Sequence, residues 1–342
     1  MKRASNMLPL VLGTLGLLVG NASALITIQS VPVGNINNPA DWMFDAGSVG
    51  YDYSMGKYEV TLNQYCAFLN AVGATDTYSL YNPLLNSLPQ VRGIIRTGSS
   101  GSYHYSVFGS GNRPVTYVSW FDAARFVNWL QNGQPTGLQG PATTEAGVYT
   151  LNGATSGTGF ARDPGALFCL STQDEWHKAA YYDPTGASGN AGYWLYPTRS
   201  NDQPNSRPGN SSDPNSANYY YDDGIANGYN GGNALNNSIN LPSGNALTDA
   251  GAYTLARSYY GTFDQAGNVV EWTETVSDGL CVLLGGSWNS TDGGSAGLIG
   301  STDPTEERWE IGFRVAIIPE PSVGVVTLTG FVLLAWWRKR AP

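Results

Sequence analysis

The chain has 342 residues, of which 13% are charged, 12% are aromatic and 43 are glycine, and its formal net charge is −9. A helical bundle would be richer in Ala, Glu, Lys and Leu, and a strongly acidic chain is a poor partner for nucleic acid or an anionic membrane surface. The composition predicts an α+β protein with few helices, short strands, long coil and an aromatic core. No repeat or internal boundary is visible, so we treat residues 25–318 as one unit.

The first 24 residues have the pattern of an export signal. Lys2 and Arg3 give a basic start, residues 8–19 are apolar, and Ala22-Ser23-Ala24 is a small-residue cleavage site. The apolar run is shorter than a membrane span requires. We therefore expect residues 1–24 to be removed and the mature chain to begin near Leu25.

Three capping boxes predict three helices, because each pairs a Ser or Thr with an acid or amide three residues later. The pairs are Thr61 with Gln64, Ser119 with Asp122, and Thr172 with Glu175. Gly73 is expected to end the first helix. His177, in the third helix, is expected to face solvent.

Strands are expected in the short apolar runs 91–95, 103–108 and 113–118, and within residues 25–60. Residues 183–245 are dense in Asn, Gly, Ser, Asp and Tyr. A loop of that length is either functional or mobile.

The three cysteines are far apart in the sequence, and each has apolar neighbours. Cys66, Cys169 and Cys281 are expected to be buried thiols, although an exported protein could instead form one disulfide whose pairing the sequence does not specify. His104 and His177 are the only histidines, which argues against a multi-histidine zinc or iron site.

The C-terminus reads as a sorting segment over residues 319–342. Pro319-Glu320-Pro321 precedes about fifteen apolar residues and then the basic tip Arg338-Lys339-Arg340. This arrangement resembles the PEP-CTERM sorting signal of Gram-negative bacteria. The resemblance implies transient membrane anchoring by a short transmembrane helix, cleavage by an exosortase-type peptidase, and delivery to the cell surface or extracellular matrix. A permanent C-terminal anchor is the alternative.

Within residues 261–289, Gly267 and Gly285-Gly286 lie among the acids Asp264 and Glu271 and the indoles Trp272 and Trp288. Glycine is favoured where the backbone needs positive φ or a close approach. Asp264 and Glu271 are hard oxygen donors of the kind calcium prefers. The pattern alone also fits a surface loop with solvated acids.

Six blocks occur in one order along the chain. They are Met55-Gly-Lys-Tyr-Glu-Val-Thr61, Arg113-Pro-Val-Thr-Tyr-Val-Ser-Trp120, Leu170-Ser-Thr-Gln-Asp-Glu-Trp176, Gly267-Asn-Val-Val-Glu-Trp272, Gly285-Gly-Ser-Trp288 and Gly312-Phe-Arg314. Together they resemble the formylglycine-generating enzyme family, also called sulfatase-modifying factors. The resemblance covers nearly all of the mature chain and implies a C-type-lectin-related α+β fold.

The resemblance also implies calcium sites. One would use the Asp264 and Glu271 side chains with the Gly267 and Val269 carbonyls. A second would begin at Asn218 and the Tyr219 carbonyl, with its partners in the Asn- and Gly-rich segment before Asp249.

At the catalytic centre the chain departs from the family. The family's copper oxidase uses two cysteines just after Gly-Gly-Ser, and those positions are Ser290 and Ser295 here. Cu(I) selects thiolates, so copper is not expected. A Ser-His-Asp hydrolase using Ser287 has no supporting sequence pattern.

We therefore expect an exported, secreted domain that acts as a non-catalytic binding or structural module. Its ligand would be a peptide or glycan in a pocket lined by Ser287, Trp288, Asn289, Ser290 and Ser295. Nearby Trp and Tyr side chains fit sugar stacking and an aromatic core equally well. The alternative is an oxidoreductase of the formylglycine-generating type that modifies an exported protein through a different cofactor arrangement.

The sorting segment makes a direct prediction about the mature protein. Intact-mass measurement of the protein recovered from the cell surface should give a C-terminus near residues 319–322. A mass that includes Pro342 would contradict cleavage.

Overall fold

The computed structural model describes residues 25–189, 192–206, 213–220, 244–297 and 299–319. The predicted export signal, and the predicted sorting segment beyond residue 319, lie outside the described residues. Within the described ranges, no helix combines the length and apolar character needed to cross a membrane.

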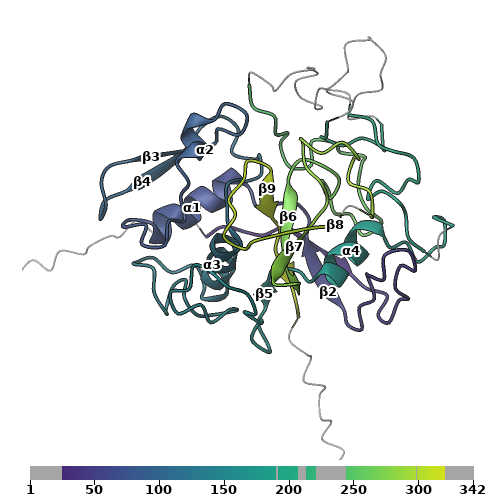
Figure 1. The fold of residues 1–342 in the computed structure, drawn as a ribbon, viewed down its shortest axis with the longest axis horizontal. Helices are drawn as coiled ribbons and strands as arrows, with labels where there is room; N and C mark the ends of the chain where they lie inside the picture. The colour runs from purple at the N-terminus through teal and green to yellow at the C-terminus, as the bar shows by residue number, and fades with distance from the viewer. Residues whose placement is uncertain (1–24, 190–191, 207–212, 221–243, 298, 320–342) are drawn as a thin grey trace, which may run out of the picture.

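The described strands form three small sheets (Figure 1). The first has the order β1-β2-β10-β5 and is antiparallel, with β1 at Ser30–Val33, β2 at Tyr53–Gly56, β10 at Ala316–Ile317 and β5 at Phe168–Cys169. The second is the hairpin of β3 (Ile94–Thr97) and β4 (His104–Val107). The third has the order β8-β7-β6-β9, with β8 at Ile299–Thr302, β7 at Leu280–Leu284, β6 at Val270–Ser277 and β9 at Ile311–Phe313. Only β6 and β9 pair in parallel among these strands.

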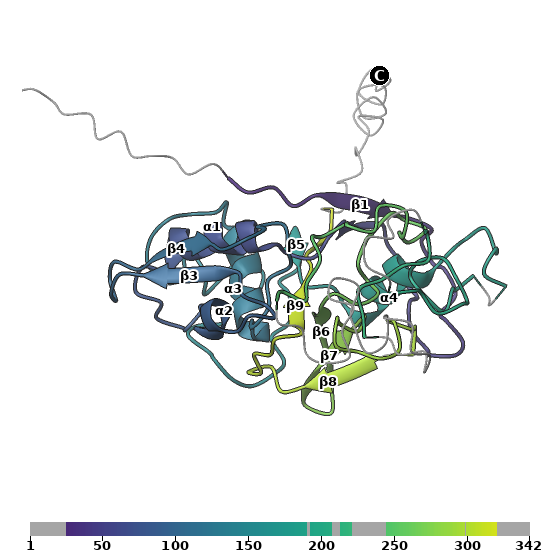
Figure 2. The same ribbon diagram turned by 90° about the horizontal axis from the view of Figure 1, so that it is seen from above.

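The three predicted helices are confirmed, each with its capping box. They are α1 (Leu62–Val72), α3 (Trp120–Gln131) and α4 (Gln173–Tyr181), and a short α2 (Leu84–Ser87) was not predicted. In each box the N-cap side chain accepts from the third helical N–H while the third side chain accepts from the N-cap N–H. Figures 1 and 2 place α1, α3 and the β3–β4 hairpin on one side of the β6–β9 sheet and α4 on the other.

An aromatic cluster joins the two larger helices to the third sheet. Tyr65 and Phe68 of α1 meet Phe126 and Trp129 of α3 at ring-centroid distances between 5.3 and 6.1 Å. Phe313 of β9 closes the cluster at 5.3 Å from Phe126. Offset and edge-on ring contacts of this kind add to the free energy gained by burial. The expected α+β class with an aromatic core is confirmed.

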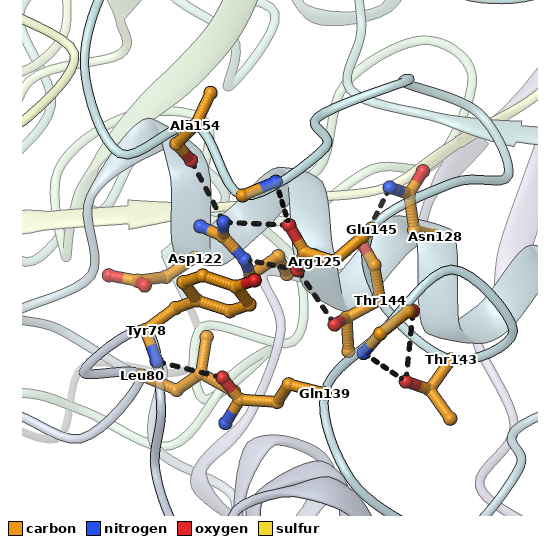
Figure 3. Close-up of polar contacts among 12 residues, drawn as sticks. Tyr78, Leu80, Asp122, Arg125, Asn128, Gln139, Thr143, Thr144, Glu145 and Ala154 are labelled. Atoms are coloured by element: carbon orange, nitrogen blue, oxygen red, sulfur yellow. Dashed lines mark hydrogen bonds and ion pairs between the residues drawn. The ribbon is translucent and has the colours of Figure 1, made fainter.

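A buried polar network on α3 holds the turn-rich chain that follows it (Figure 3). Arg125 Nε lies 2.7 Å from Glu145 Oε1, and Arg125 Nη2 donates to the Ala154 carbonyl at 2.8 Å. The Asn128 amide oxygen accepts from the amides of Val148 and Tyr149, both at 2.8 Å. The side chains of Arg125 and Asn128 supply the hydrogen bonds that a sheet would otherwise supply to the backbone of this segment, because buried backbone groups need partners even where there is no sheet.

Two expected strands differ from the structure. Residues 113–118 form only a single bridge, Thr61 with Pro114. Proline has no N–H to donate to a ladder, and Tyr117 takes a positive φ of 52°. The run expected at 91–95 becomes β3, which begins only at Ile94.

The expectation that His177 faces solvent is wrong. Its side chain is fully buried, and its Nε2 lies 3.1 Å from Asp41 Oδ2. The rings of Tyr181 and Tyr193 pack against it. Asp41 is far away in the sequence, so the helix pattern could not show that this face has a polar partner inside.

Candidate functional site

A buried ion pair lies at the centre of the molecule. Arg314, which follows β9, donates from Nε and Nη2 to the two carboxylate oxygens of Glu271 in β6, each at 2.6 Å. Both side chains are fully buried. The paired geometry satisfies both Glu271 oxygens and matches the planar guanidinium.

Three further contacts complete this pair. Arg314 Nη1 donates to the Gly56 carbonyl and Nη2 to the Phe263 carbonyl, both at 2.9 Å. The indole N–H of Trp176 in α4 donates to Glu271 Oε2 at 2.7 Å. One guanidinium therefore ties the end of β2, the loop before β6, and β6 itself, while Glu271 adds α4.

Two other acids, the buried Glu59 and the half-buried Asp264, lie beside the pair, so the charges do not balance. The charges of Asp264 and Glu271 both raise the pKa of Glu59, after desolvation by burial as the largest cause. Burial raises the pKa of Asp264 to about 6. Three carboxylates face one guanidinium, and Glu59 Oε1 has no hydrogen-bond partner. An unpartnered buried carboxylate oxygen is costly unless it is protonated or meets a cation.

Asn268 links this acidic cluster to Asn218. Its Nδ2 donates to Glu59 Oε2 at 3.3 Å, and its Oδ1 accepts from Asn218 Nδ2 at 3.1 Å. Asn268 has a positive φ of 60°, and its backbone N–H donates to the Asn218 carbonyl at 2.7 Å. The Asn218 side-chain oxygen is buried and has no partner.

The structure brings together one residue from each of the two predicted calcium sites. Asn218 and Gly267 form a parallel bridge. A Cβ built on Gly267 would lie 2.2 Å from the Asn218 carbonyl oxygen, and φ there is +81°, so only glycine fits. Tyr219 is also buried, and its hydroxyl donates to the Pro204 carbonyl.

The predicted ligand Glu271 is engaged by Arg314 and Trp176, and Asp264 Oδ2 accepts from the Gly251 N–H at 2.5 Å. Among the described residues, no three acidic, cysteine or histidine side chains converge as metal ligands. Carbonyls such as those of Gly267 and Val269 would have to complete a calcium site. Asp264 also borders a cavity of about 10 Å³, roughly the size of one water.

The predicted serine pocket is held by its own hydrogen bonds. Ser290 Oγ accepts from the Ser287 N–H at 2.9 Å and lies 3.2 Å from Ser287 Oγ. The Asn289 N–H donates to Ser287 Oγ at 3.2 Å. Asn289 is exposed, while Ser290 and Ser295 are half-buried. These hydrogen bonds stabilise a turn, and they engage the side-chain oxygens of Ser287 and Ser290 within it.

Trp288 belongs to the core. It is 2% exposed and packs against Trp309 at a centroid distance of 5.1 Å. It is therefore not available as a stacking platform for a sugar. Two cavities lined by described residues lie elsewhere, one beside Trp120 and one beside Tyr58.

The cysteines are buried free thiols, as expected. Cys66 lies in α1, Cys169 in β5 and Cys281 in β7, so they occupy a helix and two different sheets. Burial raises the pKa of Cys66 to about 11 and that of Cys281 to about 12. These sulfurs are poor thiolate donors.

Three residues of the buried cluster were not assigned a role from the sequence, although each lies in a block named above. They are Glu59, Asn268 and Arg314. The available signal was charge within an otherwise apolar block, since an Arg after Gly312-Phe313 needs a buried acid. Sequence spacing could not show that its partner is Glu271, 43 residues away.

The comparisons with known proteins identify the domain type. The model of the sulfatase-modifying factor enzyme 1-like domain matches residues 32–318. No curated protein matches the chain. Three solved structures are similar: CarF, variable protein 1 of Treponema denticola, and PvdO from Pseudomonas aeruginosa.

CarF is 21% identical with a TM-score of 0.49, over 85% of this chain and 98% of its own. The Treponema protein is 19% identical with a TM-score of 0.45, over 85% and 95%. PvdO is 15% identical with a TM-score of 0.39, over 84% and 91%. Structural similarity at this level supports no conclusion about activity.

The buried pair predicts a large effect of one substitution. Arg314→Met leaves Glu271 charged and unpaired in the interior, and we expect urea denaturation to show a loss of about 3–5 kcal/mol. Replacing both residues by apolar ones should cost less than the single change.

The matched control is Arg308→Met. Its pair with Glu306 spans 3.0 Å, but the two side chains are 48% and 42% exposed. This change should cost at most about 1 kcal/mol. Equal losses from Arg314→Met and Arg308→Met would contradict the central role of the buried pair.

Proposed function

Because the chain belongs to the family of sulfatase-modifying factor enzyme 1-like domains, we propose that it is an exported, calcium-stabilised member that serves as a non-catalytic binding or structural module at the cell surface or matrix. This proposal rests on where the cysteines lie in the chain and on their being buried free thiols. Ser290 and Ser295 stand where the family resemblance places the copper cysteines, and the three cysteines present are buried free thiols on other elements.

A copper oxidase of the known type needs two thiolates that a single Cu(I) ion can reach. In this chain the hydroxyls of Ser287 and Ser290 bond to each other and to local amides. Hard, neutral hydroxyls do not replace soft thiolates at Cu(I). The segment after Gly286 therefore supports a surface for recognition, with exposed Asn289 at its tip. A peptide or glycan is the ligand class we propose.

The experiment for this proposal follows the mass of a Cys-x-Pro-x-Arg peptide incubated with the purified protein, copper and oxygen. We expect no change beyond the rate seen with copper alone. Conversion of the thiol to an aldehyde by the wild-type protein would overturn the proposal in favour of the oxidoreductase. The double variant Ser290→Cys, Ser295→Cys is the control, and it should gain Cu(I) binding that the wild type lacks.

The calcium part of the proposal is supported by the charge of the buried cluster. The three carboxylates of Glu59, Asp264 and Glu271 outnumber the single guanidinium of Arg314, and Glu59 Oε1 has no hydrogen-bond partner. The donors are hard oxygens, which suit calcium. The ion would be held by Asp264 and the Gly267 and Val269 carbonyls. Glu271 could contribute a second lone pair of an oxygen that already accepts from Arg314. The ion would neutralise the surplus negative charge.

Without calcium, the pH dependence should have a definite sign. Burial raises the folded-state pKa of Asp264 to about 6, above its ordinary value of 3.8. The folded protein then holds a proton that the unfolded chain has lost, so stability falls as pH rises between about 4 and 6. Calcium competes with that proton, and its stabilising effect should grow through the same range.

We therefore expect chelation to lower the melting temperature at about pH 7.5 and to have little effect at about pH 5. Asp264→Asn should reduce the effect of chelation, whereas the exposed Asp278→Asn should not. A melting temperature that chelation leaves unchanged at the higher pH would refute a structural calcium ion.

A further inference from the structure

A cavity of about 310 Å³ opens beside the end of the β6–β7 hairpin. Its walls come from the first residue of α3, from β6 and β7, and from residues 157–162. A volume of this order accommodates a small molecule. Neither the serine segment nor the acidic cluster lines it, so it is separate from the site described above.

One side of the cavity is apolar and aromatic. Trp120 and Phe160 stack with centroids 5.8 Å apart and planes 28° apart. The Trp120 indole N–H already donates to the Thr273 carbonyl at 3.1 Å, so the indole presents carbon to the cavity. Val276 and Cys281 continue this wall. Burial keeps the Cys281 thiol protonated, because its pKa rises to about 12.

The opposite side carries an ion triad with a surplus negative charge. Arg162 Nε donates to Glu274 Oε1 at 2.8 Å, and its Nη1 and Nη2 donate to the two oxygens of Glu175 at 3.0 and 2.9 Å. Its Nη2 also donates to the Leu170 carbonyl at 3.2 Å. The guanidinium is therefore nearly saturated by protein partners, while two carboxylates share its one positive charge.

Of the two acids, Glu274 is the one that lines the cavity. Its Oε2 accepts from the Tyr149 hydroxyl at 2.8 Å, and its side chain is 13% exposed. Each carboxylate oxygen can accept a second hydrogen bond. The exposed Asp303 carboxylate also lies near enough to Cys281 to raise its pKa. The chain as a whole carries −9, which favours cations at any cleft.

The mouth of the cavity is formed by an exposed glycine-rich turn. Gly157 and Gly159 have positive φ values of 93° and 88°, and a Cβ at either would meet nothing within 4 Å. Thr158 between them is exposed. The cavity is thus open to solvent on a side where no packed element blocks entry.

We propose that this cavity binds a small organic cation, an amine or guanidinium attached to an aromatic or aliphatic body. The body lies against Trp120, Phe160 and Val276, and the cationic end donates to Glu274. The aromatic faces attract the same charge through their quadrupoles. An anionic ligand of equal shape meets surplus negative charge and a guanidinium most of whose N–H groups already donate to protein acceptors. This inference does not depend on the proposed function of the serine segment.

The test uses three probes of one shape and different charge: phenethylamine, 2-phenylethanol and 3-phenylpropionate. Isothermal titration calorimetry on the wild-type protein should show the amine binding roughly tenfold more tightly than either of the others. Glu274→Gln should remove most of the preference for the amine over the alcohol, because it removes the surplus charge and keeps a hydrogen-bond acceptor.

The steric control is independent of charge. Val276→Trp places a large ring at the rim, where Val276 is 41% exposed, and should abolish binding of all three probes. Ile299→Trp, at a 39% exposed position on β8 outside the cavity, should leave binding unchanged. If Glu274→Gln does not fold, this pair still decides the location.

Three results would overturn the proposal. They are binding of phenylpropionate as tight as that of the amine, amine binding that survives Val276→Trp, and no detectable binding of the amine by the folded wild-type protein.

Discussion

Removing a guanidinium from water is so unfavourable that a buried one requires hydrogen-bond and ion-pair partners from the surrounding chain. Arg314 meets this constraint by drawing on Glu271, the Gly56 carbonyl and the Phe263 carbonyl, which come from widely separated parts of the sequence. The surrounding fold has little regular structure, with strands of two to eight residues. In other folds, long hydrogen-bonded ladders fix the relative positions of strands. Here the buried pair helps to fix the positions of β2, β6 and the chain after β9 relative to one another.

The same centre explains why the neighbouring acids matter. Once Arg314 is committed to Glu271, the charges of Glu59 and Asp264 remain without a counterpart, and the pKa values of both rise. A proton or a divalent ion can restore balance, and the two answers predict opposite responses to pH. Asn268 couples this cluster to Asn218 and, through the Trp288 N–H, to the serine segment. Direct hydrogen bonds therefore connect the cluster to the surface that we propose for recognition.

The two polar centres away from this cluster follow the same rule with different outcomes. Arg125 of α3 forms a balanced pair with Glu145 in the long irregular segment that follows the helix, and the pair orders that segment. Arg162 is shared by Glu175 and Glu274, and the excess acid borders an open aromatic cavity. A balanced buried pair stabilises structure, whereas an unbalanced one beside a cavity favours a ligand of opposite charge. That difference separates a structural network from a candidate binding site.

Local patterns along the chain determined the helices, because the two residues of a capping box are three positions apart and successive residues of an apolar stripe are three or four positions apart. They also determined the α+β class, since this is a property of composition and of the spacing of short apolar runs. The partners of buried charges were decided only by the tertiary structure: His177 with Asp41, Glu271 with Arg314, and Glu274 with Arg162. The strand expected at 113–118 is reduced to a single bridge, because Pro114 has no N–H to donate and Tyr117 takes a positive φ, while the Tyr117 N–H donates to the Arg308 carbonyl elsewhere in the fold. The segment from Gly261 to Asn289 reads from sequence as an irregular stretch of glycines, acids and indoles, but in the structure it contains β6 and β7. Desolvation is a property of three-dimensional packing, and only the packing made Glu271 the counterion of Arg314.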